Sequence, residues 1–319
     1  MNVHPLLGDL TADQFLAEYW QKKPLLIRNA ISNFRPPVDG DDLAGMSLEA
    51  EVESRLVIGE DWQLEHGPFD ESRFKLLPDR NWTLLVQGVD LWVPEVSDLL
   101  ARFDFLPPWR KDDVMVSYAE DGGNVGPHFD YYDVFLLQGL GQRRWQIGQL
   151  CDESETLSND TPLKVLNNLQ VTDEWVLDPG DMLYLPPMMA HHGVAIGKCT
   201  TFSIGFRAPA ATEMLDDLAT ELLSRDITPN HLSDPPLTAA MASQAISSAY
   251  IEQVKLLLQE TLDDEQMLTE WFAQFMTEPK YPGSIELTEE SRTALIKNVS
   301  SQGNIPTFSR FINGQKQDS

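Results

Sequence analysis

The sequence predicts a mainly β fold with helical additions, because its middle and its ends differ in hydrophobic pattern. Between Asp113 and Ala208, short apolar runs alternate with turn residues, which is typical of a β-sandwich or barrel. Before and after this region, apolar residues recur at three- and four-residue steps, which favours helices. The chain has 319 residues, 42% of them hydrophobic, enough to bury one large core or two modest ones.

The N-terminal segment opens with a helix. Thr11 and Gln14 form a capping box, and the helix that they start places Phe15 and Trp20 on its buried side before it ends near Pro24. Pro94 marks a break or a fresh helix start further along. We expect a buried strand over 25–30 and helical segments over 43–57 and 82–103.

The middle region contains the expected strands. Turns that contain glycine divide them, as at Gly122-Gly123 and at Pro179-Gly180. The strands cover 114–119, 132–138, 143–148, 174–177, 181–186, 192–196 and 200–206.

The pattern returns to helix after Pro209. Residues 211–280 contain 3 basic and 13 acidic residues, which favours a helical bundle with an acidic outer face. Trp271, Phe272 and Phe275 belong either to its core or to a dimer contact. A more polar segment, to which the pattern assigns no fold, follows residues 281–283. The expected helices cover 213–223, 239–260 and 265–276.

Charge and cysteine content exclude several classes of protein. With 23 basic and 50 acidic residues the net charge is −27, which argues against direct binding to nucleic acid or to an anionic membrane. A basic protein partner fits this charge, although the charge also fits a role in solubility alone. No apolar stretch is long enough to span a membrane. Two cysteines, Cys151 and Cys199, and no signal sequence favour the cytoplasm.

The segment Gly126-Pro127-His128-Phe129-Asp130 carries the candidate chemistry. In a strand, His128 and Asp130 point to the same side, although such a pair alone is often only a satisfied polar contact. His191 or its neighbour His192 adds a third ligand. Two histidines and one carboxylate on one face of a metal are typical of non-haem Fe(II) oxygenases. Zinc with a bound water is the alternative for the same ligands.

Arg143 is the candidate cation of this site. If Trp145 and Ile147 pack inside the barrel, strand alternation places Arg143 inside as well and Arg144 outside. A buried guanidinium needs an anionic partner, and the distal carboxylate of 2-oxoglutarate would serve. An internal salt bridge is the alternative. Two flanking hydroxyl groups, those of Ser117 and Ser203, are candidates for additional hydrogen bonds to that carboxylate.

The chain resembles the bacterial JmjC-type ribosomal oxygenases (cupin-4 family), which are 2-oxoglutarate-dependent arginine hydroxylases. The resemblance covers most of the chain and fades after about residue 280. It rests on AEYWQKKPLLIRNAI, NWTLLVQGVD, GPHFDYYDVFLLQGLGQRRWQIG, DPGDMLYLPPMMAHHGVA and FSIGFRAP. It implies a double-stranded β-helix (jelly-roll) catalytic domain over 1–208, a helical dimerisation region over 209–280 and a small, truncated winged-helix-like segment over 281–319.

The resemblance also implies roles for particular residues. By this resemblance, the metal ligands are His128, Asp130 and His191, with His192 as the fallback for His191. Arg143 is the residue that binds the distal carboxylate of 2-oxoglutarate. One departure lies at Ala119, where the family often has a serine, so that a hydrogen bond to the cosubstrate is lost or is provided by Ser117.

The implied function is an Fe(II)-, 2-oxoglutarate- and O2-dependent hydroxylation of the β-carbon of an arginine in a large-subunit ribosomal protein, by a homodimer. Alternatives are the same chemistry on a histidine, lysyl demethylation, and a non-catalytic barrel that binds a ribosomal protein. Three residues beside the metal motif, Tyr131, Tyr132 and Asp133, are candidates either for contact with the target or for structural roles in the strand.

Overall fold

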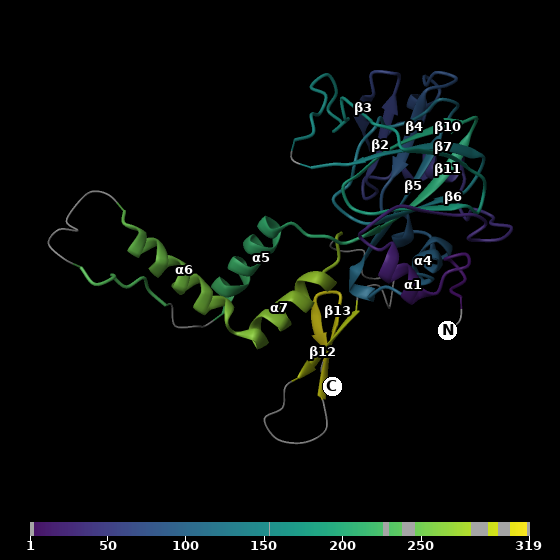
Figure 1. Ribbon diagram of the computed structural model, residues 1–319. Helices are drawn as coiled ribbons and strands as arrows, with labels where there is room; N and C mark the ends of the chain where they lie inside the picture. Colours follow the sequence, from purple (N-terminus) through teal and green to yellow (C-terminus); the bar gives the residue numbers. More distant parts are fainter. Residues whose placement is uncertain are drawn as a thin grey trace. The chain divides into compact units, whose positions relative to one another are not determined.

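The computed structural model describes residues 3–152, 154–225, 230–237, 246–281, 293–298 and 307–317. The chain divides into two compact units, one that extends to Ala208 and one that starts at Pro209. Figure 1 shows the ribbon with its helices and strands labelled. Within these ranges, no helix is both long and apolar enough to cross a bilayer.

Two antiparallel sheets form the barrel of the first unit. The larger sheet has the strand order β1-β9-β6-β11-β5-β4-β2-β3, and the smaller has the order β10-β7-β8. The fold class predicted from the sequence, a mainly β jelly roll, is confirmed. The strands are β1 (Leu25–Ile27), β2 (Ser54–Ile58), β3 (Gln63–His66), β4 (Trp82–Val86), β5 (Lys111–Ala119), β6 (Val134–Gln138), β7 (Gln142–Leu150), β8 (Asp173–Leu177), β9 (Met182–Leu185), β10 (Met189–Ile196) and β11 (Cys199–Phe206).

Strand alternation separates an inner from an outer core. Val134 and Leu136 of β6 pack with Trp145 and Ile147 of β7, so this apolar cluster fills the space between the two sheets. Phe135 lies between them in the sequence and belongs to a second cluster, on the other face of the large sheet. Every second residue of a strand therefore faces the barrel interior.

Helices cover the outer face of the large sheet. Phe15 of α1 and Val96 of α4 join the outer cluster, and both helices lie on the same side of the barrel in Figure 1. The capping box of α1 is confirmed, because the Gln14 backbone N–H donates to Thr11 Oγ1 at 3.2 Å and the reciprocal bond is also present. The helices of this unit are α1 (Ala12–Glu18), α2 (Gly40–Met46), α3 (Glu71–Phe74) and α4 (Pro94–Ala101), with short 3-10 turns at η1 (Val89–Leu91) and η2 (Pro108–Arg110).

Two helix predictions in the N-terminal region were partly wrong. Within 43–57 the helix α2 ends at Met46, and Ser54–Ile58 form strand β2 instead. Within 82–103 the first five residues form β4, and helix starts afresh at Pro94. Both strands pair with each other and β4 also pairs with β5, so long-range pairing overrides a local spacing of apolar residues that resembles a helix.

In its described residues, the second unit has three helices and a small sheet. Trp271 of α7 packs with Leu218 of α5 and donates its indole N–H to Asp217 Oδ1 at 2.6 Å, so this ring belongs to the core of one chain. The expected helix over 239–260 is described only from residue 246 on, and its helical part starts at Ser248. The sequence pattern gave no sign of the three-stranded sheet. The elements are α5 (Ala211–Ser224), α6 (Ser248–Leu262), α7 (Glu265–Thr277), β12 (Thr293–Asn298), β13 (Thr307–Ile312) and β14 (Gln315–Gln317).

Candidate active site

Two distant segments are joined by backbone hydrogen bonds at the predicted metal motif. The His128 N–H donates to the His191 carbonyl at 2.9 Å, and the His191 N–H donates back to the His128 carbonyl at 2.8 Å. The Met188 N–H donates to the Asp130 carbonyl at 2.7 Å. These bonds bring together the backbone segments that carry the three predicted ligands.

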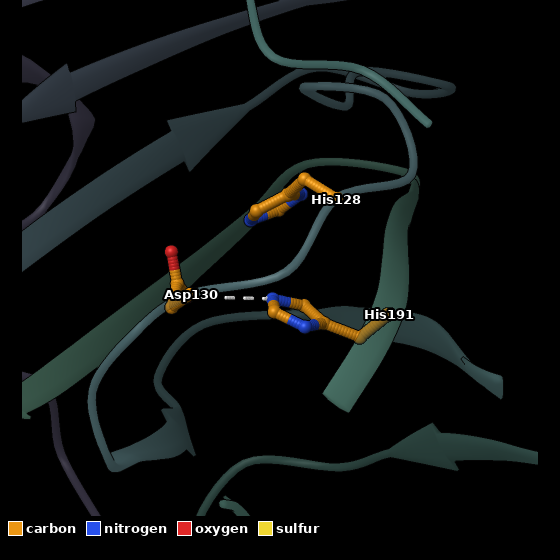
Figure 2. Close-up of side chains that lie close together, drawn as sticks. All are labelled: His128, Asp130 and His191. Atoms are coloured by element: carbon orange, nitrogen blue, oxygen red, sulfur yellow. Dashed lines mark ion pairs between the residues drawn. The ribbon is translucent and has the colours of Figure 1, made fainter. Parts of the chain in front are cut away.

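The side chains of His128, Asp130 and His191 form one cluster. One ligand-type atom from each lies within 4.8 Å of the other two, close enough to hold one metal ion. His191 Nε2 lies 3.7 Å from Asp130 Oδ2, the contact drawn as a dashed line in Figure 2. Within the described ranges, no other group of histidine, cysteine or acidic side chains shows such spacing.

The orientation of both imidazoles suits metal binding. His128 Nδ1 lies 3.0 Å from the Gly126 carbonyl, and His191 Nδ1 lies 2.9 Å from the Met189 carbonyl. A carbonyl only accepts hydrogen bonds, so Nδ1 carries the proton in each ring and Nε2 keeps a free lone pair. Burial, together with the nearby His128, lowers the pKa of His191 to about 4, which keeps this ring neutral as a ligand must be.

Gly126 makes the approach to His128 possible. Its φ of +79° lies in the left-handed region, and a Cβ at this position would come within 2.8 Å of the Val165 side chain. The glycine therefore allows the chain to turn tightly between Asn124 and the first histidine.

Arg143 is a buried cation on the inner face of β7. The residue is only 4% exposed, whereas Arg144 is exposed, as strand alternation predicted. One guanidinium N–H donates to Cys199 Sγ at 3.6 Å, and Nε has no hydrogen-bond partner. In the part of the chain that the structure describes, no carboxylate lies within ion-pair distance of Arg143, so the alternative of an internal salt bridge finds no support. A buried guanidinium in this state suits an anionic ligand.

Comparisons with known proteins agree with this geometry. A profile of the JmjC domain matches residues 98–214, which include all three clustered residues, and a profile of AraC-like ligand-binding domains matches residues 172–265. The chain is 36% identical over 269 residues to the ribosomal protein uL16 3-hydroxylase of Escherichia coli, which covers 84% of this chain and 71% of that protein. It is 38% identical over 260 residues to a probable ribosomal oxygenase of Haemophilus influenzae, which covers 80% of this chain and 64% of that protein.

A solved structure extends the similarity to nearly the whole chain. YcfD, a ribosomal oxygenase from Escherichia coli, in complex with cobalt and 2-oxoglutarate, has a TM-score of 0.79 and 31% identity over 97% of this chain and 86% of that chain. The chain belongs to the JmjC-type ribosomal oxygenases. As a member of this family, it is a 2-oxoglutarate-dependent oxygenase that uses a metal, iron in the working enzyme, and O2.

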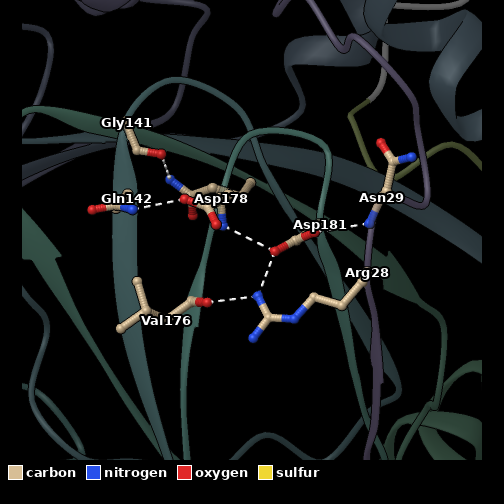
Figure 3. Close-up of polar contacts among 8 residues, drawn as sticks. Arg28, Asn29, Gly141, Gln142, Val176, Asp178 and Asp181 are labelled. Atoms are coloured by element: carbon tan, nitrogen blue, oxygen red, sulfur yellow. Dashed lines mark hydrogen bonds and ion pairs between the residues drawn. The ribbon is translucent and has the colours of Figure 1, made fainter.

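The turn Asp178–Asp181 joins several strands of this oxygenase's barrel through its polar contacts (Figure 3). Asp181 Oδ1 accepts the Asn29 backbone N–H at 2.8 Å, and its other oxygen accepts the Asp178 N–H and pairs with Arg28. Gln142, the neighbour of Arg143, donates its side-chain amide to Asp178 Oδ1 at 2.7 Å. The turn therefore ties β1, β7 and β9 together and fixes the start of the strand that carries Arg143.

His192, the fallback ligand, lies outside the cluster of His128, Asp130 and His191. Its Nε2 is 3.2 Å from Asn124 Oδ1, an oxygen that also accepts the Trp62 indole N–H at 2.7 Å and the Gly126 N–H at 2.9 Å. Burial lowers the pKa of His192 to about 4, so the ring is neutral and donates to Asn124. This contact holds the loop before His128. The sequence showed no sign of it, because Asn124 and Trp62 are distant along the chain.

The two candidate serines lie on inner strand faces. Ser117 is opposite Thr201 and Ser203 is opposite Met115 in the β5–β11 ladder, and no hydrogen bond to Arg143 is present for either hydroxyl in the described residues. Cys199 contacts Arg143 instead, and sequence reasoning missed it. Counting back from Ser203 in steps of two along β11 would have placed Cys199 on the same inner face.

Of the three residues after the metal motif, Asp133 has a structural role in this oxygenase. It is fully buried and accepts the Tyr184 hydroxyl at 2.6 Å and the Gln21 side-chain amide at 3.1 Å, with Arg110 Nη2 at 3.3 Å. Burial raises the pKa of the Asp133 carboxyl, and these contacts oppose that rise. Tyr131 and Tyr132 are exposed beside the clustered residues.

Proposed function

We propose that this oxygenase hydroxylates the β-carbon of an arginine in a large-subunit ribosomal protein. The name of the Escherichia coli relative, a ribosomal protein uL16 3-hydroxylase, supports a ribosomal protein as substrate and the β-carbon as the position, because position 3 of an amino acid is its β-carbon. The net charge of −27 favours the encounter with a basic protein. The cytoplasm, where such a substrate is made, is the proposed location.

Tyr132 is the residue that favours arginine as the target side chain. The residue is 42% exposed and lies two positions after Asp130. Although part of the residue is exposed, its hydroxyl is largely enclosed by protein, and this burial raises the pKa of the hydroxyl. The charges of Asp130, Asp113 and Asp112 raise it further, while Arg55 opposes them with a smaller effect. An exposed aromatic ring in a negative field is suited to a guanidinium, which stacks on aromatic faces and pairs with carboxylates.

The protein's own groups orient the reactants. His128, Asp130 and His191 would hold the metal, and the Arg143 guanidinium would bind the distal carboxylate of 2-oxoglutarate. The apolar side chains of the inner core keep water from the site. When bound, the metal and cosubstrate supply the chemistry that inserts oxygen into an unactivated C–H bond, and succinate and CO2 leave as products.

The test is a reaction of the iron-loaded full chain with 2-oxoglutarate, O2 and peptides from large-subunit ribosomal proteins. We expect succinate release that depends on one peptide, and tandem mass spectrometry that locates one added oxygen on the β-carbon of an arginine. An oxygen on a histidine would contradict the arginine assignment. Peptide binding without succinate release would favour the non-catalytic binding barrel instead.

Substitution of Tyr132 sharpens this test. Tyr132→Ala should raise the KM for the peptide by about tenfold, the loss of roughly 1.4 kcal/mol of stacking. Tyr131→Ala is the matched control, because Tyr131 is 63% exposed and packs on Phe129. Steady-state kinetics at saturating 2-oxoglutarate measure both. An equal KM for the two variants would contradict the role of Tyr132.

We also propose that residues 1–208 form the catalytic domain, 209–280 a dimerisation region and 281–319 a small C-terminal domain. Helix α6 supports the second assignment, since none of its residues is buried within the second unit. Its apolar side chains are exposed, as are two on α5. They are Ile251, Val254, Leu256, Leu258 and Leu262 of α6, and Leu215 and Leu223 of α5.

A charge on this apolar face should separate the dimer. Leu258→Glu should convert a dimeric species to a monomer at micromolar concentration, because the new carboxylate would be desolvated at the interface. Light scattering coupled to size exclusion measures the mass, and Glu252→Gln on the same helix is a control. A monomeric unmodified protein would contradict the proposed dimer.

A further inference from the structure

The thiol of Cys199 is the nearest side-chain partner of the Arg143 guanidinium. Cys199 is 0% exposed, and its Sγ lies 3.6 Å from Arg143 Nη2. Arg143 is itself more than nine-tenths buried, and its Nε is unpartnered. A guanidinium in this state needs an anion, and an anion that reaches it also reaches the thiol.

The apolar neighbours of the thiol are small. Cys199 packs with Ala119 and Ala195. Ala119 is its partner in the β11–β5 ladder, and Ala195 is the partner of Arg143 in the β10–β7 ladder. Two methyl groups therefore flank the pair of polar groups, and neither offers a hydrogen-bond donor. Cys199 and Arg143 therefore form a pair of polar side chains in this part of the barrel interior.

We propose that Cys199 is a cosubstrate-binding residue, and that its S–H donates to the distal carboxylate of 2-oxoglutarate that Arg143 holds. This rests on the proposed role of Arg143. A thiol is a weak donor, so its contribution is smaller than that of the guanidinium. The contact depends on the far end of the ligand. Cys199 therefore helps to select a five-carbon diacid over a 2-oxo acid that lacks the second carboxylate.

The test uses binding rather than turnover. Cobalt-loaded full-length protein is titrated with 2-oxoglutarate and, separately, with pyruvate, which has the same chelating end and no distal carboxylate. Cys199→Ala should weaken 2-oxoglutarate binding about fivefold, the effect of one lost hydrogen bond, and leave pyruvate binding unchanged. Cys199→Ser keeps a donor and should bind 2-oxoglutarate within about twofold of the unmodified protein.

Matched variants separate the possible failures. Cys151→Ala removes the other buried free cysteine, which packs with Leu166 and Ala190, and should leave both affinities unchanged. If Arg143→Ala loses 2-oxoglutarate while Cys199→Ala binds it normally, the thiol contact is wrong and the role of Arg143 stands. If Arg143→Ala keeps normal affinity for 2-oxoglutarate, the proposed cosubstrate site itself is wrong.

A labelling experiment on the unmodified protein makes the test independent of variant folding. The rate at which a small methanethiosulfonate modifies Cys199 is followed by mass spectrometry. We expect 2-oxoglutarate to slow it at least about fivefold and pyruvate to leave it unchanged. Equal protection by both ligands, or by neither, would overturn the proposal, as would a Cys199→Ala variant that binds both ligands equally poorly.

Discussion

Two charged side chains are buried in the same barrel with opposite surroundings. Asp133 has a hydrogen-bond partner on each carboxylate oxygen and the Arg110 guanidinium beside it. Arg143 contacts a thiol and, at 5.8 Å, the Trp145 ring, and no ion pair to it is present in the described part of the chain. A charge whose partners all come from the protein holds the structure together, whereas a buried charge that lacks a counter-ion is available to a ligand.

Removal of a clustered imidazole should have the largest effect on function. His128→Ala should abolish cobalt binding and lower turnover more than about 100-fold, because two remaining ligands hold a divalent ion poorly. The melting temperature of the metal-free protein should change little, since the backbone hydrogen bonds between the two segments remain. Cobalt absorption and thermal unfolding measure the two effects. A large loss of stability would instead show that His128 has a structural role, as Asp133 has.

Arg143→Ala should weaken 2-oxoglutarate binding by about 30- to 100-fold, the effect of removing one partner of a buried charge pair. The metal-free variant should be at least as stable as the unmodified protein, because an unpaired buried charge is removed. Calorimetry and thermal unfolding check both statements. Arg144→Ala, on the exposed side of the same strand, is the control and should change neither. If the Arg143→Ala protein were less stable, Arg143 would stabilise the fold as Asp133 does, and the proposed difference between the two residues would be wrong.

Asp133→Asn should act in the opposite way. The amide cannot accept hydrogen bonds at both atoms, so Tyr184, Gln21 or Arg110 loses its partner, and the free energy of unfolding should fall by about 3 kcal/mol. Urea unfolding of the full chain measures the loss. Binding of 2-oxoglutarate to the folded protein should stay within about twofold. A strong loss of cosubstrate affinity at unchanged stability would contradict the structural role.

Part of this contrast could be predicted from the sequence. Strand alternation alone placed Arg143 inside and Arg144 outside, because the period of two is a local property of a strand. The same local reasoning failed at Ser54–Ile58 and Trp82–Val86, where pairing with distant strands decides the conformation. Once a strand is known, the local pattern predicts the face on which a side chain lies, but it does not predict which residues that side chain contacts.

The parts of the site that escaped prediction all depend on contacts between distant residues. His191 and His192 are adjacent in the sequence, yet His191 lies in the cluster with His128 and Asp130 whereas His192 contacts Asn124. Asp133 follows the metal motif directly, yet its partners Gln21 and Tyr184 come from other elements. Alternation along β11 gives the side of the strand on which Cys199 lies, but its contact with Arg143 joins two different sheets and could not be predicted locally.

The reciprocal hydrogen bonds between His128 and His191 have a consequence for metal supply. Since these backbone bonds already join the two segments that carry the rings, an ion should spend little binding energy on ordering the chain. A rigid cluster of two imidazoles and one carboxylate accepts several first-row ions, and copper and zinc bind such donors more tightly than Fe(II) does. The ion found in the purified protein will therefore reflect which metals the growth medium and the cell provide.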